Sequence, residues 1–329
     1  MRDSLLNEAE RAVQPMFSKF NILSGLLLAG AMVGFTAWAR VQPNRLPAPP
    51  AVATIRFVPA ESAGWRIAGA RLAQAWSLSS DEPRFGGLSA LAIDGGDFLA
   101  LSDSGVAIRF APPGAGSATS PGRFADLGDG PCDPRWKSCR DSEALARAPD
   151  GGWFVGFENN HALWRFDAAL RRGVQVAGLG DQGFTPNRGI EGLLALGGKR
   201  LIAFPEDGGG FLAVGLRPRT ISRESVRGLG RGVSDAAMLP DGRVLVVRRR
   251  FGPTGFRAEL LALGRDRQGW AVAPVARLSL GWRDNVEGAA AVPLPDGGTR
   301  LWLVTDNDFR GGVKTLLLAI DLPPATGRR

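Results

Sequence analysis

Short apolar runs alternate with polar turns along most of this chain, and one paired-strand pattern recurs five times. Each copy has an acidic or small residue, an apolar run, a Gly/Asp turn, a second apolar run and a polar end. The copies cover residues 86–105, 141–160, 189–208, 234–250 and 284–308. Alternating runs of this length are typical of antiparallel hairpins. Their spacing of about 45–55 residues predicts a β-propeller with one four-stranded blade per repeat.

The predicted fold class is therefore all-β, with five or six four-stranded blades. Five hairpins are visible in the sequence, and the length of the chain accommodates a sixth blade. We expect β-like runs in residues 53–79 to supply an outer strand that pairs with residues 315–322 and closes the ring. The Gly-, Pro- and Ser-rich residues 112–139 are predicted to form a long loop.

The repeat also predicts where polar side chains meet. The first strand of a propeller blade lines the central axis and the second returns beside it, so its end lies near the start of the first. The inner strands are predicted to open with Glu143, Glu191, Asp235 and Glu287, and the returning strands to close with Asp103, Glu158, Glu206 and Asp306. An arginine precedes each inner strand, at Arg84, Arg140, Arg188, Arg231 and Arg283. We expect carboxylates and guanidinium groups to alternate at one mouth of the propeller.

Charge narrows the class of partner. The 329 residues carry a formal net charge of +8, which favours anionic ligands. However, almost all basic residues are Arg, and Ala and Gly are abundant, as GC-rich codon usage produces. No basic run exceeds residues 248–250, and no nucleic-acid-binding motif is present, so nucleic-acid binding is excluded.

The N-terminal residues predict export. Residues 20–39 are apolar and uncharged between Lys19 and Arg40, which fits a signal peptide ending in Ala37-Trp38-Ala39 or a membrane anchor. Translation from Met16 would give a complete signal peptide. We therefore divide the chain into residues 1–39 (signal peptide or anchor), 40–52 (a Pro-rich linker) and 53–329 (the propeller). The expected location is periplasmic or secreted, or alternatively anchored by the N-terminal segment.

The two cysteines agree with an oxidising compartment. Cys132 and Cys139 enclose a short loop just before the second repeat, and neither a CxxC motif nor a zinc-type spacing is present. We expect a local disulfide, with a free thiol pair as the alternative.

Three stretches carry a resemblance to a known family: DSEALARAPDGGWFVGFENNHALWRF, RGIEGLLAL and NVEGAAAVPLPDGGTRLWLVTDNDF. They resemble the phytase-like propeller family, described by the phrase "esterase-like activity of phytase", over about residues 80–322. The resemblance implies an exported propeller that hydrolyses esters, including phosphate esters. The fourth repeat departs from the pattern, because it ends in three arginines where the others end in an acid.

A serine-esterase triad is not indicated. No GxSxG nucleophile elbow is present, and His161 is the one histidine of the chain. His161 follows Glu158 at the mouth end of a returning strand, so these two residues are the candidate catalytic groups. A lone histidine is more often structural, and that alternative stays open.

Converging carboxylates favour a metal-assisted hydrolase, with Ca²⁺ as the candidate cofactor because it takes oxygen ligands in flexible geometry. The candidate ligands are Glu143, Glu191, Glu287 and Asp306, followed by Asp103 and Glu206. Candidate clamps for an anionic substrate are Arg140, Arg188 and Arg283.

Two alternatives remain at this point. Repeated acid–arginine spacings also fit a network of ion pairs that only stabilises the strands. The same mouth would also suit a non-catalytic periplasmic binding or scaffold propeller. In either functional case we expect a monomer that takes a small anionic or ester ligand, with membrane contact only through an uncleaved N-terminal segment.

Overall fold

The computed structural model describes residues 46–114, 117–185, 188–253, 255–282, 284–310 and 312–324. They belong to one compact unit, Arg45–Arg329. The predicted signal or anchor segment, the Met16 start and Arg283 lie outside the described residues. Within the described ranges, no helix is long and apolar enough to cross a membrane.

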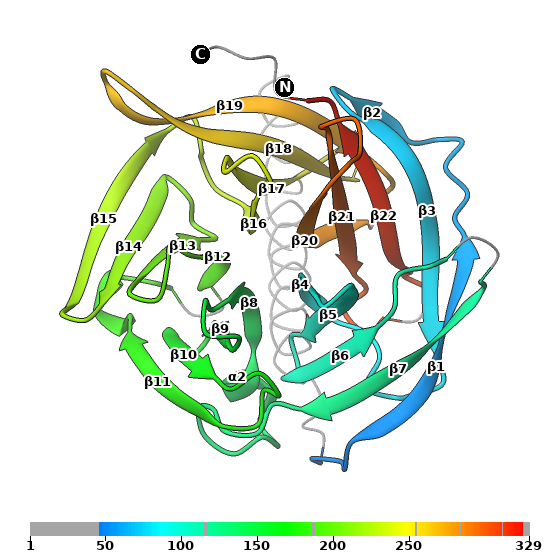
Figure 1. Ribbon diagram of the computed structural model, residues 1–329, viewed down its shortest axis with the longest axis horizontal. Helices are drawn as coiled ribbons and strands as arrows, with labels where there is room; N and C mark the ends of the chain where they lie inside the picture. The colour runs from blue at the N-terminus through cyan, green and yellow to red at the C-terminus, as the bar shows by residue number, and fades with distance from the viewer. Residues whose placement is uncertain are drawn as a thin grey trace, which may run out of the picture. The chain divides into compact units, whose positions relative to one another are not determined.

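The described strands form five antiparallel blades arranged in a ring (Figure 1). The first contains β4 (Leu88–Asp94), β5 (Asp97–Ser102), β6 (Val106–Phe110) and β7 (Thr119–Asp126). The second contains β8 (Ser142–Arg147), β9 (Trp153–Phe157), β10 (Ala162–Phe166) and β11 (Gly173–Gly178). The third contains β12 (Ile190–Ala195), β13 (Arg200–Pro205), β14 (Gly210–Leu216) and β15 (Arg219–Arg227). The fourth contains β16 (Val233–Met238), β17 (Val244–Gly252), β18 (Gly255–Asp266) and β19 (Gly269–Ser279).

The fifth blade joins the two ends of the propeller sequence and confirms the predicted closure. It contains β20 (Asn285–Pro293), β21 (Thr299–Asp306), β22 (Thr315–Leu322) and, from the N-terminal side, β3 (Arg71–Ser80). β3 pairs antiparallel with β22, and β1 (Ala51–Pro59) bridges β3 to β7 of the first blade. The short β2 (Arg66–Ala68) pairs with β19 of the fourth blade.

Small side chains let the five inner strands approach the axis closely. β4, β8, β12, β16 and β20 contact one another in cyclic order. Gly288 of β20 faces the backbone of β4, where an added Cβ would lie 2.8 Å from the Leu91 nitrogen. Gly192 of β12 approaches the Ala236 nitrogen of β16 in the same way, at 3.0 Å. Larger apolar residues of neighbouring blades pack outside this ring and form the core.

A β-bulge interrupts every inner strand at the equivalent position. The bulged residues are Ser89, Glu143, Glu191, Ser234 and Glu287. A bulge re-aims its side chain relative to the regular pleat. The prediction that Asp235 is the fourth member of this set was therefore wrong by one residue, since Ser234 occupies the position.

Two further boundaries differ from the sequence prediction. β7 lies inside residues 112–139, which were predicted to be loop, because it pairs with both β6 and β1. β1 begins at Ala51, two residues before the predicted start of the propeller. Helix α2 (Lys137–Arg140) precedes β8.

Candidate functional site

The bulges project two kinds of side chain. Three of the five bulged residues, Glu143, Glu191 and Glu287, carry carboxylates. The hydroxyls of Ser89 and Ser234 instead donate to the carbonyl oxygens of Ser142 and Val286, at 2.6 and 2.8 Å. Three blades therefore contribute a carboxylate at this position. In the other two blades, the serine hydroxyl forms a hydrogen bond to the inner strand of the next blade.

The ends of the returning strands form the second set. The backbone N–H groups of Asp103, Glu158, Glu206 and Arg249 donate to carbonyls just before the inner strands, at 2.7–3.0 Å. In the fifth blade, Asp306 pairs in register with Asn285. The returning strand therefore ends with an acid in blades one, two, three and five, whereas in blade four it ends with Arg249. We call the face at which β5, β9, β13, β17 and β21 end the mouth face.

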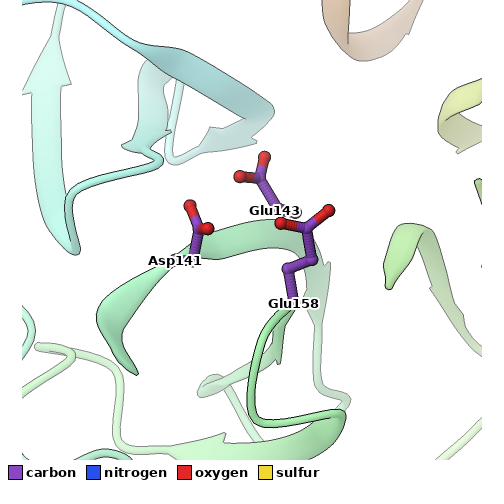
Figure 2. Close-up of side chains that lie close together, drawn as sticks. All are labelled: Asp141, Glu143 and Glu158. Atoms are coloured by element: carbon purple, nitrogen blue, oxygen red, sulfur yellow. The ribbon is translucent and has the colours of Figure 1, made fainter. Parts of the chain in front are cut away.

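Eight carboxylates gather at this face, and we call them the carboxylate ring: Asp103, Asp141, Glu143, Glu158, Glu191, Glu206, Glu287 and Asp306. Oxygens of Asp141, Glu143 and Glu158 lie within 4.8 Å of one another (Figure 2), and so do those of Glu158, Glu191 and Glu206. Glu158 belongs to both triads. Asp141 was absent from the predicted ligands, although it begins the second repeat.

Two cations of the chain neutralise opposite parts of the carboxylate ring. The Lys137 ammonium lies 2.9 Å from Asp103 and 3.2 Å from Asp141. The Arg249 guanidinium donates to Glu206 at 2.9 Å and also to Glu287. Neither cation was among the predicted site residues. The RRR run at the end of the fourth repeat was the available signal for Arg249.

Burial and mutual repulsion shift the acids toward their neutral forms. Burial, and then the charges of Asp141 and Glu191, raise the pKa of Glu158 to about 9. Burial raises the pKa of Glu191 to about 8, with Glu206 adding to the shift and Arg249 opposing it. The pKa of Asp103 is raised to about 6 by burial against the opposing charge of Lys137. Burial also raises the pKa values of Glu143 and Asp306 well above their usual range. Such shifted carboxyls are typical of functional sites.

Asp235 has a different role. Its carboxylate accepts hydrogen bonds from the backbone N–H of Ala236 at 2.7 Å and from that of Ala289 at 2.6 Å. Ala289 belongs to the inner strand of the next blade. Asp235 therefore joins two blades and is not a member of the carboxylate ring.

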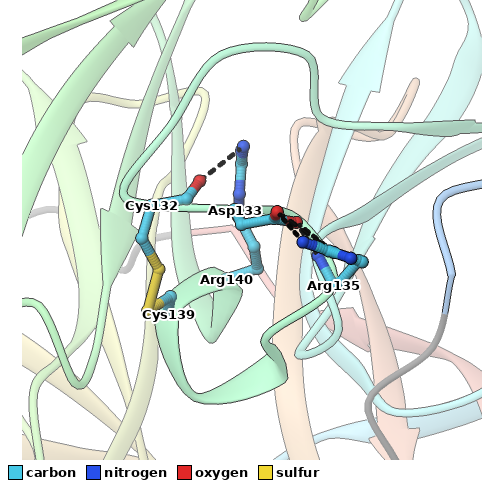
Figure 3. Close-up of a disulfide and its surroundings, with 5 residues drawn as sticks. All are labelled: Cys132, Asp133, Arg135, Cys139 and Arg140. Atoms are coloured by element: carbon cyan, nitrogen blue, oxygen red, sulfur yellow. Dashed lines mark hydrogen bonds and ion pairs between the residues drawn. A yellow bond between two sulfur atoms is a disulfide. The ribbon is translucent and has the colours of Figure 1, made fainter.

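The three arginines predicted to bind an anionic substrate differ in what the structure shows of them. Arg140 is buried, and its guanidinium donates to the carbonyls of Gly128, Asp129 and Cys132 at 2.7–3.2 Å. Figure 3 shows this guanidinium beside the Cys132–Cys139 disulfide, which confirms the predicted bridge. Arg140 thus supports the loop that carries Lys137. Arg188 remains at the edge of the carboxylate ring, 3.4 Å from Glu206 and 3.2 Å from Asp207, with its side chain 40% exposed. Arg283 lies outside the described residues.

His161 lies in the turn after β9. Its ring packs against Phe184, with the ring centroids 5.2 Å apart. Its buried Nδ1 has no hydrogen-bond partner within the described ranges. The backbone N–H of His161 donates to the Glu158 carbonyl in the turn after β9. No contact brings its imidazole to a carboxylate of the ring among the described residues.

Two carboxylates indicate that the ring suits a cation. Glu191 is 4% exposed, yet its side chain forms no hydrogen bond or ion pair within the described part of the chain. Glu287 Oε2 is buried and likewise has no partner there. The donor set is carboxylate oxygen alone, which suits a hard cation such as Ca²⁺ better than zinc. A bound cation would also remove the repulsion that raises these pKa values.

Comparison with known proteins gives one family and a set of distant propellers. The family described as "Phytase-like: Esterase-like activity of phytase" matches residues 83–309. The structure is also similar to a chain of Kuenenia stuttgartiensis hydrazine synthase, at 14% identity and a TM-score of 0.39, covering 72% of this chain and 63% of that one. It is similar to the major allergen of Malassezia sympodialis at 15% identity and a TM-score of 0.46, covering 77% of this chain and 88% of that one. It is similar to the PQQ-bound aldose sugar dehydrogenase of Streptomyces coelicolor at 15% identity and a TM-score of 0.41, covering 80% of this chain and 99% of that one. No curated protein matches the chain.

Proposed function

Because the chain belongs to the phytase-like family, we propose that it hydrolyses a small ester or phosphoester at the carboxylate ring with the help of bound Ca²⁺. One observation carries the proposal: oxygens of five acids, from blades two and three, converge in two triads that share Glu158. The five acids are Asp141, Glu143, Glu158, Glu191 and Glu206. A purely structural network would leave fewer carboxylates without a cationic partner.

In this proposal Glu158, Glu191 and Glu206 hold the cation. When bound, Ca²⁺ would supply positive charge to orient the anionic or carbonyl oxygen of the ester. Glu287 shares Arg249 with Glu206, so the second carboxylate oxygen of Glu287 is available at the same edge. Asp103 pairs with Lys137, and Asp306 lies close enough to Asp103 for the charge of that acid, after burial, to raise its pKa.

The side chains of the protein would position the substrate and transfer protons. Asp141 lies within 4.8 Å of Glu158, beside the proposed cation site, and is the candidate base for the water molecule that attacks the ester. Arg188, exposed at the rim, is the candidate contact for an anionic group of the substrate. His161 has no part in this scheme.

The test is turnover of p-nitrophenyl acetate, p-nitrophenyl phosphate and phytate by the residue 40–329 domain, with Ca²⁺ or with EDTA. We expect calcium-dependent turnover that falls at least tenfold in Glu191→Gln. Glu61→Gln, an exposed acid on the N-terminal side of β2, is the matched control and should leave the rate unchanged. Turnover that persists unchanged in EDTA and in Glu191→Gln would contradict the proposal.

The rival function has its own expected result. A non-catalytic periplasmic binding propeller would be stabilised by Ca²⁺ and would hydrolyse none of the three substrates. The proposal includes export, which is supported by the Cys132–Cys139 disulfide, since such bridges persist in oxidising compartments. Intact-mass analysis of the native protein tests export, with a mature N-terminus at or just after Arg40 as the expected result.

A further inference from the structure

A cluster of aromatic side chains lies in the open at the mouth face. Phe251, at the end of β17, is 64% exposed, and Trp282, just before β20, is 55% exposed. Their rings pack edge to face with centroids 5.6 Å apart, and Phe256 of β18 packs on Phe251 at 5.0 Å. We call Phe251, Phe256 and Trp282 the aromatic platform. Exposed rings grouped in this way commonly mark a binding surface.

The aromatic platform is continuous with the carboxylate ring. Arg249 and Phe251 are two residues apart on β17, which pairs with β18 without a register shift, so their side chains share one face of the strand. Arg249 contacts Glu206 and Glu287, and the strand that carries Glu287 begins three residues after Trp282. A molecule bound at the ring can therefore reach the platform past Arg249.

The backbone fixes the platform in place. Gly255, at the tip of the β17–β18 hairpin, has φ +91°, and an added Cβ would lie 2.4 Å from the Trp282 Cα. This close approach holds the segment that carries Trp282 against the hairpin that carries Phe251. The rings of Phe251 and Trp282 therefore already pack together before a ligand binds.

All four exposed aromatic residues in the described ranges lie at this one face, and they are Trp136, Phe251, Trp282 and Phe309. Within those ranges, aromatic rings elsewhere on the molecule, such as that of Trp270 on the outer strand β19, are at most partly exposed. Exposed aromatics spread by chance would not concentrate around the acidic site. Their placement indicates that the ligand of the site has an apolar part.

We propose that the aromatic platform binds an aromatic ring of the substrate, so that the site takes aryl-bearing monoesters rather than polyphosphates. This inference rests on the proposed function. Among the described residues, the eight carboxylates pair only with Lys137, Arg188 and Arg249, so a highly charged polyanion would find few cationic partners at this site. A ligand with one anionic group and one ring needs only one bound cation, and its ring stacks on Trp282 and Phe251.

The test uses ligands that cannot be hydrolysed. Calorimetry compares phenylphosphonate with methylphosphonate in the presence of Ca²⁺. We expect phenylphosphonate to bind about tenfold more tightly to the wild type, the gain that one aromatic contact gives. In Phe251→Ala/Trp282→Ala the ratio of the two dissociation constants should fall to about 1, with methylphosphonate binding unchanged. Val174→Ala, at a similarly exposed apolar residue of β11, should keep the wild-type ratio.

Each contrary result has a distinct meaning. Equal binding of both ligands by the folded wild type overturns the proposal and leaves hydrolysis itself standing. Platform-dependent binding without turnover keeps the aromatic subsite and removes the hydrolase. Absence of binding by either ligand overturns both. A dimer of the wild type in sedimentation velocity that dissociates in the double variant would assign the platform to a second copy of this chain, and so overturns the proposal as well.

Discussion

Arg249 lies 2.9 Å from Glu206, and the two residues occupy the same position in neighbouring blades, at the mouth end of the returning strand. The fourth blade thus supplies a counter-ion for the acid of the third. Although burial alone lowers the pKa of Arg249, the charges of Glu191 and Glu206 raise it above its ordinary value. Because the fourth repeat ends in an arginine instead of an acid, it supplies a positive charge that stabilises the carboxylate ring.

Replacing Arg249 should remove this counter-ion from the carboxylate ring. We expect Arg249→Met to lower the free energy of unfolding by about 3 kcal/mol at pH 8 in EDTA, because Glu206 and Glu287 then lose their buried cation. Urea unfolding followed by circular dichroism measures the loss. Added Ca²⁺ should restore part of it.

Arg227→Gln is the matched control for that variant. Arg227 pairs with Asp266 on the outer edge of the propeller, where both side chains are about half exposed. An exposed pair of this kind contributes little, so the variant should unfold as the wild type does. Equal stability of Arg249→Met and the wild type would show that the ring does not need its own cation.

Without metal, the thermal stability of the protein should fall as pH rises from 6 to 9. In the native state the pKa is about 9 for Glu158 and about 8 for Glu191, against 4.5 for an ordinary glutamate. The native carboxyls bind protons more tightly than the unfolded ones, so their stabilising effect is complete below pH 4.5 and is lost as pH rises through these native values.

Differential scanning calorimetry in EDTA across this pH range checks the slope. Acids paired with arginine at the surface, such as Asp94 and Asp150, have lowered pKa values and stay ionised throughout the range. They therefore leave the slope unchanged. A Tm that is constant or rises between pH 6 and pH 9 would mean that the carboxylate ring is ionised and otherwise neutralised. Ca²⁺ should flatten the slope by binding the ionised form.

Asp235 should behave as a structural acid. Asp235→Ala leaves the N–H of Ala289 without its partner and should reduce the free energy of unfolding by about 2 kcal/mol. Calcium affinity, measured by calorimetry on the folded variant, should stay unchanged. Glu191→Gln should give the opposite pair of results, with weakened calcium binding and retained stability. If both variants weaken calcium binding equally, the division between structural and ligand acids is wrong.

Reduction of the disulfide should destabilise the loop that positions Lys137. Cys132→Ser/Cys139→Ser removes a short closed loop, which is expected to lower stability by about 2–3 kcal/mol. A reducing agent should shift the urea midpoint of the wild type by the same amount and leave that of the variant unchanged. A midpoint of the wild type that is insensitive to reduction would contradict this role.

The periodic features of the fold were predictable from sequence, because hairpins with Gly/Asp turns are local patterns. Gly/Asp turns and alternating apolar runs located the inner hairpin of each blade, and the run at residues 315–322 indicated the closing strand. β7 escaped prediction because its residues, TSPGRFAD, contain few apolar positions and include proline. Its pairing with β1, far away in sequence, determines its conformation.

The candidate site was predictable to the level of the ring but not of its partners. The bulge register, which separates Ser234 from Asp235, depends on hydrogen bonding between strands and leaves no local signal. Lys137, which lies within the loop closed by the Cys132–Cys139 disulfide, pairs with Asp103 of the first blade, a contact distant in sequence. The position of Arg140 in the repeat suggested that it would bind an anion. Its guanidinium instead donates hydrogen bonds to backbone carbonyls within residues 128–132.

The pairing of β3 with β22 also sets the order of events in folding. The last strand of the described residues must find one of the first, over a separation of more than two hundred residues. Contacts this distant in sequence slow folding, and until they form, β3 and β21 have unpaired edges that invite aggregation. A nascent or truncated chain without residues 315–322 is therefore expected to depend on chaperones, and a stop codon shortly before β22 would be more damaging than many substitutions in the carboxylate ring.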